Sequence, residues 1–165
     1  MYRNTPTTAV ISGLSKRRFR PLTTYGMPRR RISNSVDARF PLRGEFDVQD
    51  GAGAAVRKVQ GGPESGTVWL SADAARKLGA KPGDSIGVGN LQLRYAATLL
   101  REPDAALDYF NVAPKVLIAY DDLAASGLVQ DGSRIQYRMV VAGEAGAVKR
   151  FAAEQRASLQ RGQRL

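Results

Sequence analysis

Apolar and polar residues alternate along the central and C-terminal parts of the chain in a way that predicts short strands. Residues 67–70 form a short apolar run, and from residue 91 to residue 99 every second side chain is apolar. This alternation is typical of a strand with one buried face, so we expect Leu91, Leu93, Tyr95, Ala97 and Leu99 to face one way. The stretch KVLIAY at residues 115–120 is continuously apolar after Lys115, which favours a central strand covered on both faces. Residues 133–141 alternate again and predict another strand.

Turn and capping residues between these runs predict short helices. Ser71 stands at an N-cap position and Gly79 at a helix end, so we expect a short helix between them. Asp121 is the predicted cap of a second helix, which ends at Gly127. Gly89-Asn90 has the chemistry of a two-residue hairpin turn. Residues 145–161 predict a longer helix. One face of this helix carries Val148, Phe151, Ala152, Gln155 and Leu159.

The segment before residue 67 carries weaker signals. Residues 36–42 favour a strand ended by Pro41 and the turn at Arg43-Gly44, whereas residues 49–66 are rich in Gly and favour a loop. Gly51 and Gly53 resemble part of a dinucleotide-binding loop, but the third glycine and the long helix are missing. These elements together predict an α+β fold, with a mixed, mostly antiparallel sheet, short helices and one longer C-terminal helix.

Composition argues against common catalytic chemistry. The chain has 165 residues, enough for one domain or one domain with a tail. It contains no His and no Cys, which removes the commonest catalytic base, the commonest metal ligand and the thiol nucleophile. We therefore predict no catalytic, cofactor-binding or metal-binding residue, and a binding or force-transmitting domain.

The net charge of +10 is unevenly distributed. Residues 1–36 contain eight Lys and Arg and no acid, while the rest of the chain has a net charge of only +2. We expect residues 1–35 to be a basic leader without a packed core, either disordered or read in a wrong frame. An export signal, an organellar transit peptide and contact with phosphate backbones are the functional alternatives for this segment.

Six short motifs resemble the extracytoplasmic domain of FtsX-like and MacB-like ABC transporter permeases, in particular the YbbP type. They are FPLRG at 40–44, GTVWL at 66–70, KLGAKPGD at 77–84, APKVL at 113–117, SGLVQ at 126–130 and GSRIQYR at 132–138. Each motif alone is unspecific, but their order and spacing across residues 36–165 make the resemblance considerably stronger. The departure is the Arg-rich segment before FPLRG, where the family would have strands preceded by a transmembrane helix.

The resemblance implies a MacB-like periplasmic domain, residues 36–165, that is a fragment of a larger inner-membrane protein. Its implied partners are a cytoplasmic ABC ATPase, acting through the rest of the permease, and a lipid, lipoprotein or peptide cargo. The isolated chain is expected to be soluble, because no stretch approaches the ~20 apolar residues that a membrane helix needs. Nucleic acid is the less favoured partner.

Several polar groups were weighed as sites and have simpler explanations. Glu102, Asp104 and Asp108 suggest a hard-cation site, but turn and capping roles are favoured. Asp121 and Asp122 suggest an acid–base pair, although an N-cap role explains Asp121 better. Ser133-Arg134 beside Asp131 suggests an anion site, against the simpler interpretation of a turn before a strand.

Aromatic residues provide the one candidate contact surface. Trp69, Tyr95 and Tyr137 alternate with polar neighbours, which favours core packing. Tyr109 and Phe110 fall instead in a loop bounded by Pro and Asp, where an exposed aromatic pair marks a contact surface.

Three functions are consistent with these observations. The favoured one is a non-enzymatic extracytoplasmic permease domain that couples ATPase-driven motion to cargo or a periplasmic partner. The alternatives are a small basic nucleic-acid-binding protein that acts through its N-terminal tail, and a hydrolase that uses a pair of carboxylates.

Overall fold

A computed structural model describes residues 7–15, 32–36, 39–103, 114–131, 135–159 and 163–164. Contacts divide the chain into two compact units. Unit 1 comprises Met1–Leu22 and Gln130–Leu165, and unit 2 comprises Thr23–Val129. The α+β fold with a mixed sheet, short helices and a C-terminal helix is confirmed.

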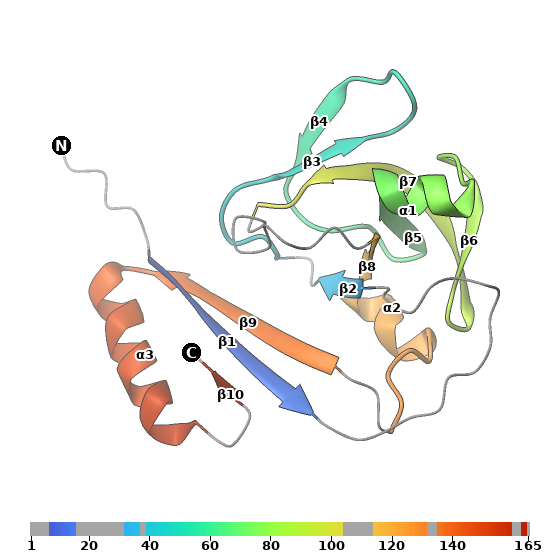
Figure 1. The fold of residues 1–165 in the computed structure, drawn as a ribbon. Coiled ribbons are helices and arrows are strands. Elements are labelled where there is room, and N and C mark those ends of the chain that lie inside the picture. Colours follow the sequence, from blue (N-terminus) through green and yellow to red (C-terminus); the bar gives the residue numbers. More distant parts are fainter. Residues whose placement is uncertain are drawn as a thin grey trace. The chain divides into compact units, whose positions relative to one another are not determined.

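Unit 2 is built on a mixed seven-stranded sheet with the order β2-β8-β5-β7-β3-β4, and β6 pairs with β7 outside this path (Figure 1). Strand β2 runs parallel to β8 and β5 runs parallel to β7, while the other pairs are antiparallel. The strands are β2 (Ile32–Val36), β3 (Phe46–Gln49), β4 (Val56–Val59), β5 (Thr67–Ser71), β6 (Ser85–Val88), β7 (Leu91–Arg101) and β8 (Lys115–Ala119). The predicted central strand is β8, which lies between β2 and β5.

Buried side chains lie on both faces of this sheet. In β5, Val68 and Leu70 belong to one cluster and Trp69 to another, and neighbouring residues of a strand point to opposite faces. The first cluster consists of Val68, Leu70, Ala74, Val88, Leu93, Tyr95, Val116 and Ile118. The second cluster consists of Phe46, Val48, Trp69, Ala97, Leu99 and Leu117. Side chains therefore cover both faces of the sheet, which explains why all residues of β8 after Lys115 are buried.

Strand β7 changes sides between the two clusters. Its pairing with β5 shifts register, so that Tyr95 lies opposite Val68 but Ala97 lies opposite Trp69, and Ala96 is the extra residue of a bulge. Tyr95 consequently packs in the first cluster and Ala97 in the second. The expectation that all alternate apolar residues of this strand face one way is wrong, because an inserted residue reverses the face of every residue after it.

In the described part of unit 2, two short helices connect strands. Helix α1 (Ala72–Leu78) begins as predicted, since the Ser71 hydroxyl accepts a hydrogen bond from Ala74 N at 3.2 Å, and it ends at Gly79 with a φ of 63°. Helix α2 (Tyr120–Ala125) has Ala119 at its N-cap, without a side-chain hydrogen bond. Asp121 is therefore not the cap, and this prediction is wrong.

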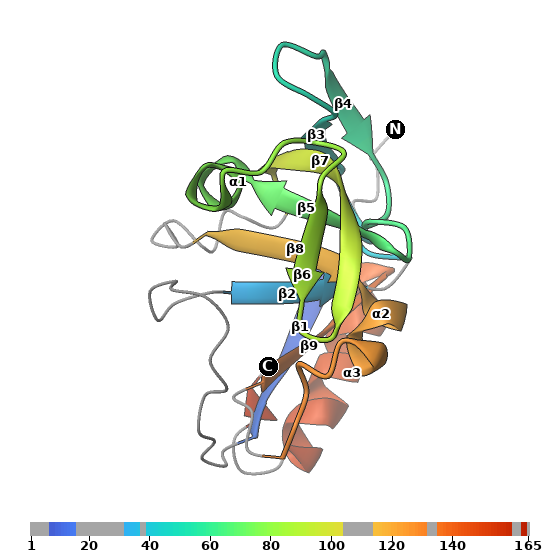
Figure 2. The same ribbon diagram turned by 90° about the vertical axis from the view of Figure 1, so that its right-hand side faces the viewer.

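The segment before β5 differs from its prediction in two places. Residues 39–45 are irregular rather than the predicted strand at 36–42, since Pro41 has no backbone N–H for a sheet ladder. Strand β4 lies inside the predicted loop at 49–66, and with β3 it forms a hairpin that projects from one end of unit 2 (Figure 2).

The described part of unit 1 contains a three-stranded antiparallel sheet and one helix. The order is β10-β1-β9, where β1 is Thr7–Ser15, β9 is Ile135–Gly143 and β10 is Gln163–Arg164. Helix α3 (Ala145–Ser158) contacts β1 and β9. All five residues predicted on its inner face are buried or half-buried, and Lys149, Arg150 and Arg156 are exposed.

Glu144 caps α3, which the sequence analysis did not foresee. Its carboxylate accepts hydrogen bonds from Gly146 N at 2.8 Å and Ala147 N at 2.9 Å. These two N–H groups hold the pKa of the Glu144 carboxyl below its usual range, so the cap keeps its charge in mildly acidic solution.

The structure places strands in the segment where the composition predicts an unpacked leader. Strand β1 and most of β2 lie within residues 1–35. The sequence analysis also expected one domain over residues 36–165, whereas contacts group both chain ends in unit 1. The assignment of residues 1–35 as a leader stays a prediction. Among the residues that the structure describes, no helix is both long and apolar enough to span a bilayer.

Candidate contact surface

Tyr109 and Phe110 lie outside the described residues, but the residues at both ends of their segment are described. Strand β7 leads into Glu102 and β8 begins at Lys115. Lys115 Nζ lies 3.3 Å from Glu102 Oε1, and the two side chains are only 14% and 19% exposed. A charge pair that is mostly removed from water is costly to break on one side only. This pair therefore fixes the distance between the two ends of the segment.

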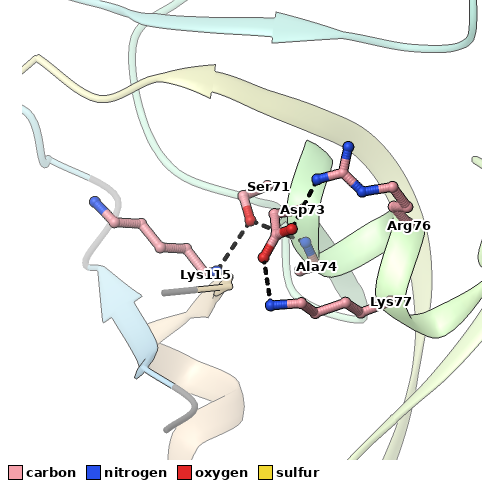
Figure 3. A network of polar contacts seen from close by, with 6 residues as sticks. All are labelled: Ser71, Asp73, Ala74, Arg76, Lys77 and Lys115. Carbon is pink, nitrogen blue, oxygen red and sulfur yellow. Dashed lines mark hydrogen bonds and ion pairs between the residues drawn. The ribbon is translucent and has the colours of Figure 1, made fainter. Parts of the chain in front are cut away.

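Ser71 forms a second attachment at the same place. Its hydroxyl oxygen accepts hydrogen bonds from the backbone nitrogen of Lys115 at 3.0 Å and from that of Ala74 (Figure 3). One side chain thus caps α1 and fixes the start of β8. Figure 3 also shows that the Lys115 side chain extends away from Ser71, so the backbone and the ammonium group of this residue serve separate contacts.

Asp73 forms ion pairs with two cations on the exposed side of α1. Its carboxylate contacts Lys77 Nζ at 2.8 Å and Arg76 Nη2 at 2.7 Å. Hydrogen bonds from Lys77 and then Arg76 lower the pKa of Asp73 below its usual value. Ion pairs of this exposed kind contribute little to stability, and we assign them no role in binding.

Asp122 is a buried structural anchor. Its carboxylate accepts a hydrogen bond from the Ser65 hydroxyl at 2.6 Å and another from Gly66 N at 2.9 Å. The carboxylate fixes the chain just before β5 to the first turn of α2. Asp121, by contrast, is exposed. The two neighbouring carboxylates therefore face different surroundings and do not form an acid–base pair.

The candidate cation and anion sites are not assembled in the described part of the chain. Glu102 is engaged with Lys115, and Asp104 and Asp108 lie outside the described residues. Among the described residues no group of three Asp or Glu side chains is arranged to hold a metal ion. Asp131 is exposed, and its proposed partners Ser133 and Arg134 also lie outside those residues.

Two of the three aromatic residues predicted in the core are confirmed there. Trp69 and Tyr95 are buried, and the Trp69 ring meets Phe46 edge to face at 5.5 Å. The Tyr95 hydroxyl is 2.6 Å from Thr98 Oγ1, so its polar end has a partner. The side chain of Tyr137 lies outside the described residues.

Gly51 and Gly53 lie in the tip of the β3–β4 hairpin, not in a dinucleotide loop. A pair of hydrogen bonds from Arg57 to Asp50, 2.7 and 2.8 Å long, closes the base of this tip. Gln49 Nε2 donates to the carbonyl of Ala54 across it. The residues after Gly53 continue into a strand, so no helix N-terminus is available for a phosphate group.

Sequence reasoning missed the apolar side chains that unit 2 exposes. Val56 on the edge strand β4 is 55% exposed and Tyr120 at the start of α2 is 52% exposed. Tyr120 ends a continuous apolar run, and that position predicts a buried ring. The ring is exposed because helix α2 begins at this residue. The other large exposed apolar residues in the described part of the chain are Leu42, Leu78, Leu100 and Val129.

The tip of the β6–β7 hairpin is fitted closely to the end of α2. Asn90 N donates to the carbonyl of Ser126 at 2.8 Å, and a Cβ at Gly89 would overlap that same carbonyl oxygen. Gly89 also has a φ of 59°, as the predicted two-residue turn requires. Both its conformation and its surroundings therefore require glycine.

Comparison with known proteins gives one relevant similarity. The chain is 37% identical over 76 residues to the uncharacterized ABC transporter permease YbbP of Escherichia coli (strain K12). The similarity supports an ABC permease-like protein. The matched segment is 46% of this chain and 10% of the permease, so the match spans about a tenth of the length of that relative. No family model and no solved structure matches the chain.

Proposed function

We propose that residues 36–165 belong to an extracytoplasmic, MacB-like domain of an ABC exporter permease. A separate ATPase would drive the motion, and this domain would pass that motion to cargo or to a periplasmic partner without performing chemistry itself. The observation that carries the proposal is the 37% identity to an ABC transporter permease over 76 residues.

The described residues suit a mechanical role. Unit 2 has apolar clusters on both faces of one sheet, and its loops are fixed by Asp122, Ser71 and the Lys115–Glu102 pair. Such a unit can move as a body because its core is closely packed. A cargo of lipid, lipoprotein or peptide character is part of the proposal.

The extracytoplasmic location is tested by cysteine accessibility in the parent permease. This chain has no Cys, so a single Ala52→Cys at the exposed hairpin tip gives a unique thiol once other permease cysteines are replaced. A membrane-impermeant maleimide should label this thiol in spheroplasts before lysis. Val68→Cys is the matched control, because its buried thiol should react only after denaturation. Labelling of Ala52→Cys only after lysis would place the domain in the cytoplasm and refute the proposal.

We further propose that Tyr109 and Phe110 form the surface that contacts cargo or partner. Their segment is bounded by Glu102 and Lys115, whose ion pair defines its base. Replacing both aromatic residues with Ser should leave the melting temperature of the chain within about 2 °C, because surface substitutions change stability little. Photo-crosslinking to cargo in the intact transporter should fall at least about fivefold, since aromatic residues dominate contact energies. Loss of folding in the double variant would instead assign both rings to the core.

A further inference from the structure

The two structural units differ sharply in charge. Unit 1 contains twelve Lys and Arg against three Asp and Glu, a net charge of +9, which leaves only +1 on unit 2. Sequence order hides this division, because basic residues from both ends of the chain belong to the same unit. The basic character is therefore a property of unit 1 as a whole and is not confined to the N-terminal segment.

Unit 2 neutralises much of its own positive charge. Five ion pairs in unit 2 engage Arg57, Arg76, Lys77, Arg101 and Lys115. In unit 1, the carboxylate of Glu144 accepts hydrogen bonds from the backbone of α3 and keeps its negative charge near Lys149 and Arg150. The three acids of unit 1 are nevertheless too few to balance its twelve cations.

Helix α3 displays part of this excess to solvent. Its apolar side, which includes the buried Val148, is covered, whereas Lys149, Arg150 and Arg156 are exposed, as is the acid Glu154. No aromatic residue lies among the exposed positions of α3, so the described helix offers no ring on which a nucleic-acid base could stack. Because the apolar side of α3 is covered, only its exposed cations are available to an anionic surface, where each Lys or Arg contributes to the attraction.

We infer that unit 1 is an electrostatic docking surface for anionic phospholipid headgroups. The preference for a bilayer over nucleic acid rests partly on the proposed function, since the similar protein is a membrane permease. Each Lys or Arg near an anionic membrane contributes a favourable Coulomb term that salt screens. Unit 1 binds the bilayer surface, whereas unit 2 has a packed core and a nearly balanced charge.

The test uses the full chain and vesicles of phosphatidylcholine with and without about 30% phosphatidylglycerol. We expect binding to the anionic vesicles only, and a steep loss of binding as salt rises. Lys149→Ala, Arg150→Ala and Arg156→Ala together should weaken this binding at least about tenfold, because each cation contributes to attraction near the surface. Alanine keeps the helix, which circular dichroism verifies.

A matched variant separates unit 1 from net charge alone. Lys58→Ala, Lys81→Ala and Arg94→Ala remove three exposed positive charges from unit 2, and this variant should bind anionic vesicles within about twofold of the original chain. An equal loss in both triple variants would overturn the assignment to unit 1. Absence of binding to anionic vesicles would overturn it as well, and so would tighter binding to duplex DNA at equal phosphate concentration. Vesicle binding needs neither ATPase nor cargo, so its failure leaves the cysteine-labelling result on location unaffected.

Discussion

Replacing Leu93 with Asp should abolish the cooperative folding of unit 2 or cost it several kcal/mol. Leu93 is 2% exposed and packs in the first cluster, so a carboxylate there would be buried without a partner. Native domains are stable by only about 5–15 kcal/mol, so a loss of this size removes much of the folded population. Urea denaturation followed by the fluorescence of Trp69, the single tryptophan, measures the change.

Arg94 provides the matched control for this substitution. It is the next residue of β7 and is exposed. Arg94→Asp introduces the same side chain and should stay within about 0.5 kcal/mol of the original chain. If both variants lost equal stability, the orientation assigned to the first half of β7 would be incorrect.

The second large effect is expected at Gly89. Alanine at this position must adopt a positive φ and must also push against the carbonyl group of Ser126, whose carbon would lie 3.0 Å from the new Cβ. The hydrogen bond from Asn90 N to the same carbonyl is then strained or lost. Together these costs should lower the free energy of unfolding by about 3 kcal/mol or more.

Gly53→Ala separates crowding from backbone conformation. Gly53 has a φ of 80°, but its Cβ would meet nothing within 4 Å. Only the conformational cost of about 1–2 kcal/mol should therefore appear there. Two equal losses would show that the hairpin tip is not fitted to the end of α2, whereas a larger loss at Gly89 confirms that contact.

Local chemistry was enough to predict several elements of this fold. Ser71 and Gly79 bound α1 as expected, and the turn at Gly89-Asn90 joins β6 to β7. These features depend on residues within a few positions of each other, where capping and turn preferences act directly. The inner face of α3 was also predicted, because one periodic stripe determines which side of a helix is covered.

The side change in β7 could not be predicted from alternation. Every second residue of β7 stays buried through the bulge at Ala96. Before the bulge these residues pack in the first cluster, and after it they pack in the second. A pattern of buried and exposed positions therefore appears uninterrupted although the side chains point to different clusters. Only the pairing with β5 reveals the extra residue.

The buried contacts of Asp122 were equally hidden from sequence reasoning. Its partners Ser65 and Gly66 are more than fifty positions away. Two adjacent aspartates before a short helix look interchangeable, and the distant loop alone determines which one is buried. The candidate pair Tyr109 and Phe110 was chosen from loop composition and remains a prediction.

Strand β7 determines how unit 2 would respond to an applied load. One continuous strand contributes to both clusters and is hydrogen-bonded to β6, β5 and β3. Sliding one half of the unit past the other would have to pull this strand out of both clusters at once. At about 3.3 Å per residue, its eleven residues extend over roughly 35 Å. A push on the β3–β4 hairpin would therefore act through β7 on the Gly89 turn and the end of α2.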